Sequence, residues 1–115
     1  MVQIIGTKKS NATKKALRYF SDRGIESQFV DLSERGLSRG ELENIVRSVG
    51  DAELLLDTES RAYEKRGMQY MEFDVLEELE DDPALLVTPI VRQRGDAVIG
   101  EDEAGWSRIA EAATA

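Results

Sequence analysis

The sequence predicts an α/β fold in which helices cover a mixed four-stranded sheet. Three observations support this class. A β-rich run, an amphipathic segment and a second β-rich run open the chain. Several helical segments follow in mid-chain as an insertion. Two apolar runs separated by a glycine turn, and then a last amphipathic segment, complete the order strand, helix, strand, helices, hairpin, helix.

The first unit is a strand, a helix and a second strand. Residues 2–5 are rich in β-branched side chains. The apolar spacing over 11–23 predicts an amphipathic helix, with Ser10 as its N-cap and Gly24 as its C-cap. Residues 27–32 form the second strand, and the connection through one helix predicts parallel pairing of the two strands.

The middle of the chain is predicted to be helical. Ser38 and Glu41 have the spacing of a capping box, which starts a helix that ends at Gly50. Residues 52–67 alternate short helical pieces. A longer amphipathic helix is predicted over 71–81, with its apolar side chains inward and its acidic side chains outward.

The last part of the chain is predicted to be a hairpin followed by a helix. Residues 85–92 form an apolar strand that Pro89 interrupts. A turn at Gly95 and Asp96 leads to a partner strand over 97–100. Residues 101–113 form the terminal helix, and the acidic residues in its first turn suit the helix dipole.

The composition limits the chemistry of the chain. Its 115 residues suit one domain, 1–115, and the sequence holds no cysteine and no histidine. Thiol chemistry, disulfides and a histidine base are therefore excluded for the chain as given. We predict no bound metal or cofactor. The sequence shows no signal peptide and no apolar run long enough for a membrane helix, so we expect a cytoplasmic protein that does not contact a membrane.

Charge is unevenly distributed along the chain. The net charge is −8, yet residues 1–21 hold five basic residues and no acidic one. The overall acidity argues against direct nucleic-acid binding, which needs a dominant basic surface. The basic residues at the start of the chain still allow one local positive face.

Lysines surround the start of the first predicted helix. Lys8, Lys9, Lys14 and Lys15 flank the capping position of Ser10. Lysines there oppose the helix dipole, whereas the free N–H groups of a helix start attract an anion. Two interpretations stay open: a site for an anion, a thiolate or an acidic partner, and a solvated face in which Ser10 is only a cap. Serine hydrolysis is disfavoured because Ser10 lacks a histidine base.

Three other features have ordinary structural interpretations. Thr88 and Pro89 lie in an apolar run, where a trans edge-strand proline is the common case and a cis bond the rarer one. The acidic run 72–82 is expected to be a solvated helix face rather than a metal site. Trp106 is expected to fill the core.

Short motifs along nearly the whole chain carry a family resemblance. They are Lys14-Lys-Ala, Gly24-Ile-Glu, Val30-Asp-Leu, Gly36-Leu-Ser, Glu41-Leu, residues 57–63, Pro89-Ile-Val, Val98-Ile-Gly and Trp106. In this order and spacing, the chain resembles the arsenate reductase (ArsC) and Spx-like family of bacterial proteins. The resemblance implies a thioredoxin-like (glutaredoxin-like) fold and a cis proline at Pro89.

The resemblance also implies a reactive site at the first helix. A nucleophilic cysteine would occupy the position of Ser10, and Spx-like members place a second cysteine at the position of Thr13. Arsenate reductases hold their oxyanion with arginines, whose places correspond to Asp57, Thr88 and Gly100. None of these three residues is a bidentate cationic donor, so arsenate is a poor candidate substrate.

The resemblance implies partners of two kinds. For a thiol or glutathione-linked reaction, the substrate would be a small thiol or a protein disulfide, with glutathione as the co-substrate. Lys9 and Lys14 would meet its carboxylate, and the backbone at Thr88, next to Pro89, would pair with an extended peptide. For a regulatory module, as in Spx-like members, the partner would be an RNA polymerase subunit.

We therefore predict a thiol-oxidoreductase scaffold that is inactive as given, with the Spx-like regulatory module as the alternative. Our hypothesis is that the native residue at position 10 is cysteine, because the lysine-rich helix start has little purpose around a serine. Ser10 is then either an engineered replacement for cysteine or the natural residue of a redox-inactive member.

Overall fold

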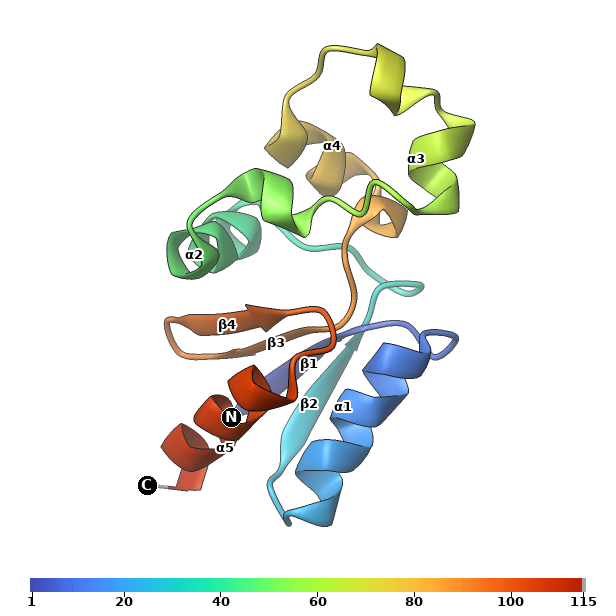
Figure 1. The fold of residues 1–115 in the computed structure, drawn as a ribbon. Coiled ribbons are helices and arrows are strands. Elements are labelled where there is room, and N and C mark those ends of the chain that lie inside the picture. Colours follow the sequence, from blue (N-terminus) through green and yellow to red (C-terminus); the bar gives the residue numbers. More distant parts are fainter. Residues whose placement is uncertain (115) are drawn as a thin grey trace.

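The computed structural model describes residues 1–114 and contains one four-stranded mixed sheet. The strands are β1 (Val2–Gly6), β2 (Ser27–Asp31), β3 (Ile90–Gln93) and β4 (Asp96–Ile99). Their order across the sheet is β2-β1-β3-β4 (Figure 1). The predicted α/β class and the mixed four-stranded sheet are confirmed.

The pairing places the first unit and the hairpin side by side. Strand β1 pairs with β2 in parallel, as predicted, with Ile4 opposite Phe29. On its other edge β1 pairs with β3 in antiparallel orientation, with Ile4 opposite Val91. Strands β3 and β4 are antiparallel neighbours. The first residues of the chain thus occupy the middle of the sheet and contact residues far away in the sequence.

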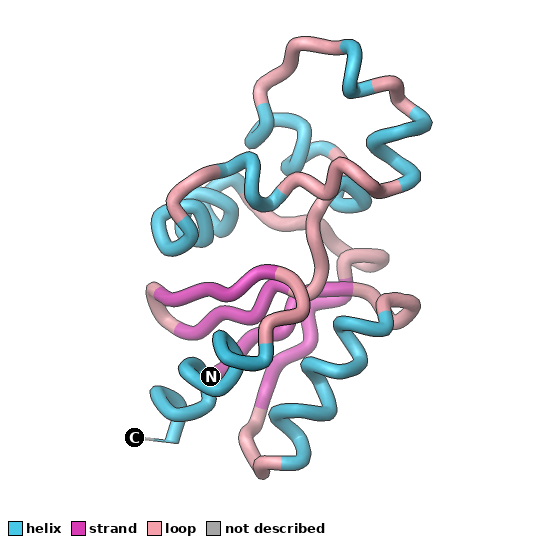
Figure 2. The backbone as a smooth tube through the Cα atoms, viewed as in Figure 1, coloured by secondary structure: helices cyan, strands magenta, loops and turns pink. Residues whose placement is uncertain are grey.

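Helices α1 (Asn11–Asp22) and α5 (Glu103–Thr114) cover one face of the sheet (Figures 1 and 2). Side chains alternate along a strand, so every second residue faces this layer. The core between them is formed by Val2, Ile4, Ala16, Phe20, Val91, Val98, Trp106, Ile109 and Ala110. Trp106 is fully buried, and its expected role in the core is confirmed.

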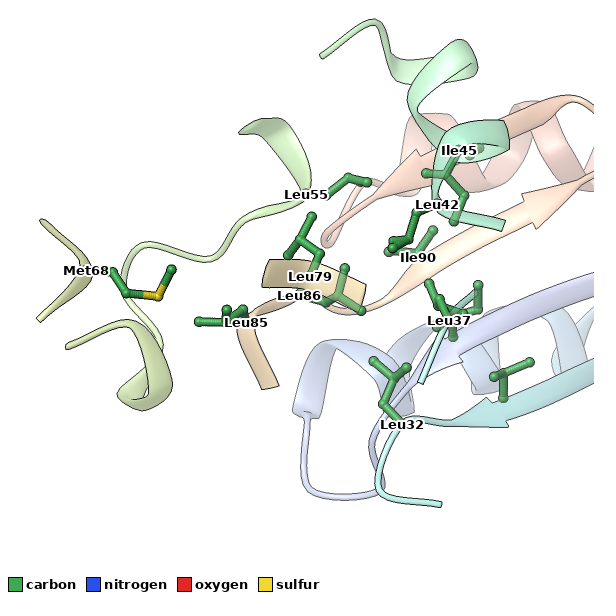
Figure 3. Packing of buried hydrophobic residues seen from close by; sticks show 13 residues of the cluster. Leu32, Leu37, Leu42, Ile45, Leu55, Met68, Leu79, Leu85, Leu86 and Ile90 are labelled. Atoms are coloured by element: carbon green, nitrogen blue, oxygen red, sulfur yellow. The ribbon is translucent and has the colours of Figure 1, made fainter. Parts of the chain in front are cut away.

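The opposite face is covered by the helical insertion, residues 39–85. It contains α2 (Arg39–Val49), α3 (Arg61–Lys65), α4 (Val75–Asp81) and the 3-10 turns Ala52–Leu55, Met68–Tyr70 and Pro83–Leu85. Figure 3 shows Leu42 and Ile45 of the insertion near Ile90 of β3, and Leu85 farther away, toward Met68. Leu55 and Leu79 belong to the same core cluster. The mid-chain prediction of several short helices is confirmed.

The predicted N-caps and the predicted end of α2 agree with the structure, whereas the predicted C-cap of α1 at Gly24 is wrong by one residue. Ser10 caps α1, and Ser38 and Glu41 form a complete capping box at α2. Gly50 ends α2 in the left-handed conformation. At the end of α1, Arg23 is the cap and Gly24 follows it with a positive φ of 68°. These signals act within one turn of the chain, which is why the sequence reveals them.

The predicted starts of two other helices lie too far toward the N-terminus. Helix α4 begins at Val75 rather than at residue 71, because the Asp74 side chain accepts from the backbone N–H of Glu77 and caps it. Helix α5 begins at Glu103 rather than at residue 101. There the Asp102 carboxylate accepts from the N–H of Gly105.

The predicted strand over 85–92 is wrong in its first half. Pro83–Leu85 is a 3-10 turn capped by Asp82, and residues 86–89 form no regular strand. Strand β3 starts at Ile90, directly after Pro89. The apolar pattern of this stretch reflects burial beneath the helical insertion rather than extended pairing. The hairpin turn also differs by one residue, because Arg94 and Gly95 form it and β4 already includes Asp96.

Candidate functional site

Ser10 lies at the junction of β1 and α1, where the chain turns from the sheet into the helix. Its N–H donates to the carbonyl of Thr7 at 3.2 Å, and its own carbonyl accepts from Lys14. Its hydroxyl oxygen accepts from the backbone N–H of Thr13 at 3.1 Å. The side chain is partly exposed, so residue 10 can be reached from solvent while its backbone is fixed.

Thr88 and Pro89 lie directly against this junction. The Thr88–Pro89 peptide bond is cis, as the family resemblance implies. The Thr88 hydroxyl donates to the Ser10 hydroxyl over 3.4 Å, which joins residues 78 positions apart. Pro89 is buried, and its carbonyl accepts from the N–H of Gly100 at 2.8 Å. The predicted residues Ser10, Thr88 and Pro89 therefore form one cluster.

The lysines around α1 are exposed, and two of them have acidic neighbours. Lys15 forms an ion pair with Glu101 at 3.2 Å. The pKa of the Asp31 carboxyl is lowered mainly by hydrogen bonds from the hydroxyl and the backbone N–H of Ser33, and Lys8 adds a smaller effect. Within residues 1–114, Lys9 and Lys14 form no ion pair.

Those two lysines leave uncompensated positive charge at the start of α1. The first turn of α1 also lacks an acidic residue. Positive side chains and the positive end of the helix dipole therefore act together, and both favour an anion or a thiolate at residue 10.

Thr13 points away from solvent. Its side chain is fully buried, and a Cβ added at Gly6 would lie 2.3 Å from the Thr13 Oγ1. Gly6 is therefore needed for α1 to approach β1 this closely. The Oγ1 of Thr13 has no hydrogen-bond partner among residues 1–114. The sequence pattern gave no signal for this close contact between the strand and the helix.

The three positions that correspond to arsenate-binding arginines surround the segment before Pro89. Gly100 bonds to Pro89, and Thr88 contacts Ser10. The backbone N–H of Asp57 donates to Leu85 at 2.8 Å, next to the isolated bridge between residues 56 and 86. Asp57 has a carboxylate, Thr88 has a hydroxyl and Gly100 has no side chain, so none of the three is a cationic donor.

Within residues 1–114 the Ser10 hydroxyl has two hydrogen-bond partners, the backbone N–H of Thr13 and the hydroxyl of Thr88. Ser10 has no histidine base, because the chain has none. In the described part of the chain no lysine Nζ donates to its hydroxyl, and no three acidic residues gather as a metal site. Acidic side chains in the run 72–82 pair instead with Arg39 and Arg66.

Comparison with known proteins gives a family and a fold. The model of the ArsC family matches residues 5–109. A relative of this chain, an uncharacterized protein of Haemophilus influenzae, is 28% identical over 107 residues, which span 90% of this chain and 93% of that protein.

Three solved structures resemble the whole chain. A candidate ArsC family related protein from Bacteroides fragilis has a TM-score of 0.84 at 14% identity and covers 94% of this chain and 96% of its own. A candidate arsenate reductase from Yersinia pestis has a TM-score of 0.81 at 24% identity, and the match covers 96% of this chain and 99% of that one. An arsenate reductase from Vibrio cholerae has a TM-score of 0.76 at 19% identity, and the match covers 98% of this chain and 94% of that one. These likenesses confirm the thioredoxin-like fold. No helix in residues 1–114 is long and apolar enough to cross a membrane.

Proposed function

Because the chain belongs to the ArsC family, we propose that it is a thiol-oxidoreductase scaffold whose reacting position is residue 10. One observation carries this proposal. Residue 10 caps α1 between the exposed Lys9 and Lys14 and touches Thr88, the residue before the buried Pro89. A thiol in this place would meet the two conditions that lower a thiol pKa, a helix start and neighbouring cations.

With serine at position 10 the scaffold is inactive as a thiol reductase. A serine hydroxyl keeps its proton at neutral pH, and the chain has no histidine to remove it. The site keeps the charge that would stabilise an anion but lacks the group that would become one. We therefore retain the hypothesis that cysteine is the native residue here.

We propose a glutathione-type or protein disulfide as the substrate rather than arsenate. Arsenate would need bidentate cationic donors, and residues 57, 88 and 100 provide none. The carboxylates of glutathione suit the ammonium groups of Lys9 and Lys14. A cytoplasmic setting would supply reduced glutathione as the co-substrate that regenerates the thiol.

The reaction of a restored thiol is a thiol-disulfide exchange. The thiolate of the Ser10→Cys variant attacks one sulfur of glutathione disulfide, and a mixed disulfide forms between that sulfur and the protein. The disulfide bond of glutathione breaks, and one glutathione thiolate leaves and takes a proton from water. No further oxidant is needed, because the disulfide itself is reduced.

The experiment compares Ser10→Cys with Ser38→Cys. Ser38 also caps a helix with its hydroxyl, but Glu41 lies in the first turn of that helix, and the nearby Arg35 and Arg39 are paired with carboxylates. We expect the thiol pKa of Ser10→Cys to lie well below the ordinary value of about 8.5 and below that of Ser38→Cys. We also expect Ser10→Cys to react faster with glutathione disulfide at neutral pH. Equal pKa values near 8.5 with equal rates would reject the proposal.

The same variants separate the two substrates. Ser10→Cys supplied with arsenate and reduced glutathione is expected to form no more arsenite than Ser38→Cys. Arsenate reduction above that control, with no enhanced reaction toward glutathione disulfide, would leave residue 10 as the reacting position but overturn the choice of substrate.

A regulatory binding module is the second candidate, because the chain keeps the family fold while serine occupies position 10. The expected partner is an RNA polymerase subunit. Binding of purified polymerase subunits, unchanged by Ser10→Ala, would support this role. Absence of saturable binding would count against it.

A further inference from the structure

A groove of about 450 Å³ lies on the helical insertion, and its lining does not include Ser10, Thr88 or Pro89. We call it the insertion groove. Its walls come from the segments around α3 and the start of α4, and the segment between these helices forms an arch at the end of the molecule opposite α5 (Figure 1). It is lined by Glu53, Leu56, Thr58, Tyr63, Met68, Gln69, Met71, Glu72, Phe73 and Val75.

Large apolar side chains are exposed at this end of the molecule. Among the described residues, four large hydrophobic side chains are exposed, and two of them, Tyr70 and Met71, are consecutive residues of the helical insertion. Tyr70 is 87% exposed, and Met71, which lines the groove, is 46% exposed. Apolar side chains gathered in one exposed region are typical of an interaction site rather than of an inert surface.

The groove combines an adaptable apolar lining with negative charge. Methionine side chains adjust to different partners because they are flexible and polarizable. Two carboxylates, Glu53 and Glu72, line the groove, and no lysine or arginine does. Neither carboxylate forms an ion pair within residues 1–114.

The basic residues near the groove are directed elsewhere. Arg66 pairs with Glu78 and Asp82 of the α4 region. Arg61 and Lys65 line a different hollow on α3. The negative charge in the groove is therefore not neutralised by side chains that line it.

We propose that the insertion groove binds a short, positively charged segment of a partner protein, which inserts an aliphatic or aromatic side chain between Tyr63 and Met71. Lysine or arginine on either side of that side chain would meet Glu53 and Glu72. Charge complementarity selects such a partner over an acidic one, and contact with the exposed Met71 adds to the affinity. This role is independent of the residue at position 10.

The test is selection from a phage-displayed library of random dodecapeptides on the folded chain. Enriched peptides are expected to carry a net positive charge and at least one leucine, methionine or aromatic residue. An enriched peptide is then synthesised with a fluorophore, and its binding is measured by anisotropy. We expect saturable binding that weakens several-fold between low and high salt.

Matched variants locate the site. Met71→Ser and Glu72→Lys are expected to weaken peptide binding about tenfold when combined, a size typical of a central contact. One control is Leu54→Ser, which changes a side chain of similar exposure to Met71 outside the groove lining. The other is Glu111→Lys, which makes the same charge change as Glu72→Lys at an exposed position of α5. Both controls should bind the peptide like the parent. Far-UV circular dichroism checks that all variants fold.

Several results would overturn the proposal. They are an absence of enriched peptides, enrichment of peptides without positive charge, and binding that Met71→Ser with Glu72→Lys does not weaken. A second copy of this chain is the competing occupant, since its own lysine-rich helix start is positive. If the solution mass of the chain rises with concentration, and the Lys9→Glu variant keeps the monomer mass, the occupant is a second copy of the chain instead.

Discussion

Helices α1 and α2 begin with the same cap but differ in the charge around it. Ser10 and Ser38 both have extended backbone, and each hydroxyl oxygen accepts a 3.1 Å hydrogen bond from the N–H three residues later. At α2 the Glu41 carboxylate also accepts from the N–H of Ser38. At α1 the first turn has no acidic residue and exposed lysines flank the cap.

This difference separates a helix start that favours stability from one that favours an anion. The carboxylate of Glu41 pairs with the N–H groups and the positive end of the α2 dipole, which lowers the energy of the folded state. The α1 start lacks that stabilisation and keeps its charge available. The comparison supports the proposed role of residue 10, and the four predictions below test it.

The largest expected effect concerns the glycines near the two helix starts. In Gly6→Ala the new Cβ would lie within 2.3 Å of the Thr13 Oγ1, so the strand and the helix must separate. We expect the free energy of unfolding to fall by about 2 kcal/mol. Gly40→Ala in α2 is the control, because its Cβ meets nothing closer than 4.0 Å and should stabilise by roughly 0.5 kcal/mol. Urea denaturation that finds the two variants equally stable would contradict this contact.

The caps themselves come next. Ser38→Ala loses the hydroxyl acceptor and disturbs the reciprocal bond of Glu41, so it should cost about 1.5 kcal/mol of stability. Ser10→Ala loses the single capping bond and should cost about 1 kcal/mol. Thermal unfolding of both variants measures the difference. A larger loss at Ser10 would mean that the α1 start contributes more stability than its charge pattern indicates.

Of the two helix starts, only that of α2 should respond to acid through a carboxylate in its first turn. Hydrogen bonds from the Arg35 guanidinium, and a weaker effect of the Ser38 N–H, hold the pKa of Glu41 below its ordinary value of 4.5. The resulting stabilisation is fully present above that value and is lost as the pH falls through the lower pKa of the folded state. Because Arg35 is half exposed, we expect only about 0.5 kcal/mol between the parent and Glu41→Gln at pH 7.

Unfolding measured from neutral pH down to about pH 2 should show this difference disappear. Lys14→Gln is the control at α1, where no carboxylate titrates in the first turn. A difference that persists to the lowest pH would show that Glu41 stabilises α2 by packing rather than by charge.

The smallest effect tests the lysines directly. Lys14→Glu places an acidic residue next to the first turn of α1 and should stabilise the helix by about 0.3 kcal/mol at low salt. Combined with Ser10→Cys, it should raise the thiol pKa. Arg18→Glu makes the same charge change one turn later. It should stabilise the helix less and raise the thiol pKa less than Lys14→Glu does. Thiol titration with equal values in both double variants would refute a specific role of Lys14.

Local features of the fold were predictable because local interactions produce them. The cap at Ser10, the box at Ser38 and Glu41, and the end of α2 at Gly50 each depend on bonds within one turn. The predicted strand over 85–92 failed for the opposite reason. Its first half is apolar because it packs under the helical insertion, and apolar composition alone does not distinguish burial in a turn from burial in a sheet.

The sequence by itself determined what chemistry this protein lacks and where its charge is concentrated. The absence of cysteine and histidine, and the lysines around Ser10, are properties of composition and order that folding cannot change. Only the tertiary structure decided that Thr88 contacts Ser10, that Thr13 is buried against Gly6, and that an acidic groove forms on the insertion. These contacts join segments far apart in the chain, and their geometry follows from the packing of the sheet and its two helical layers.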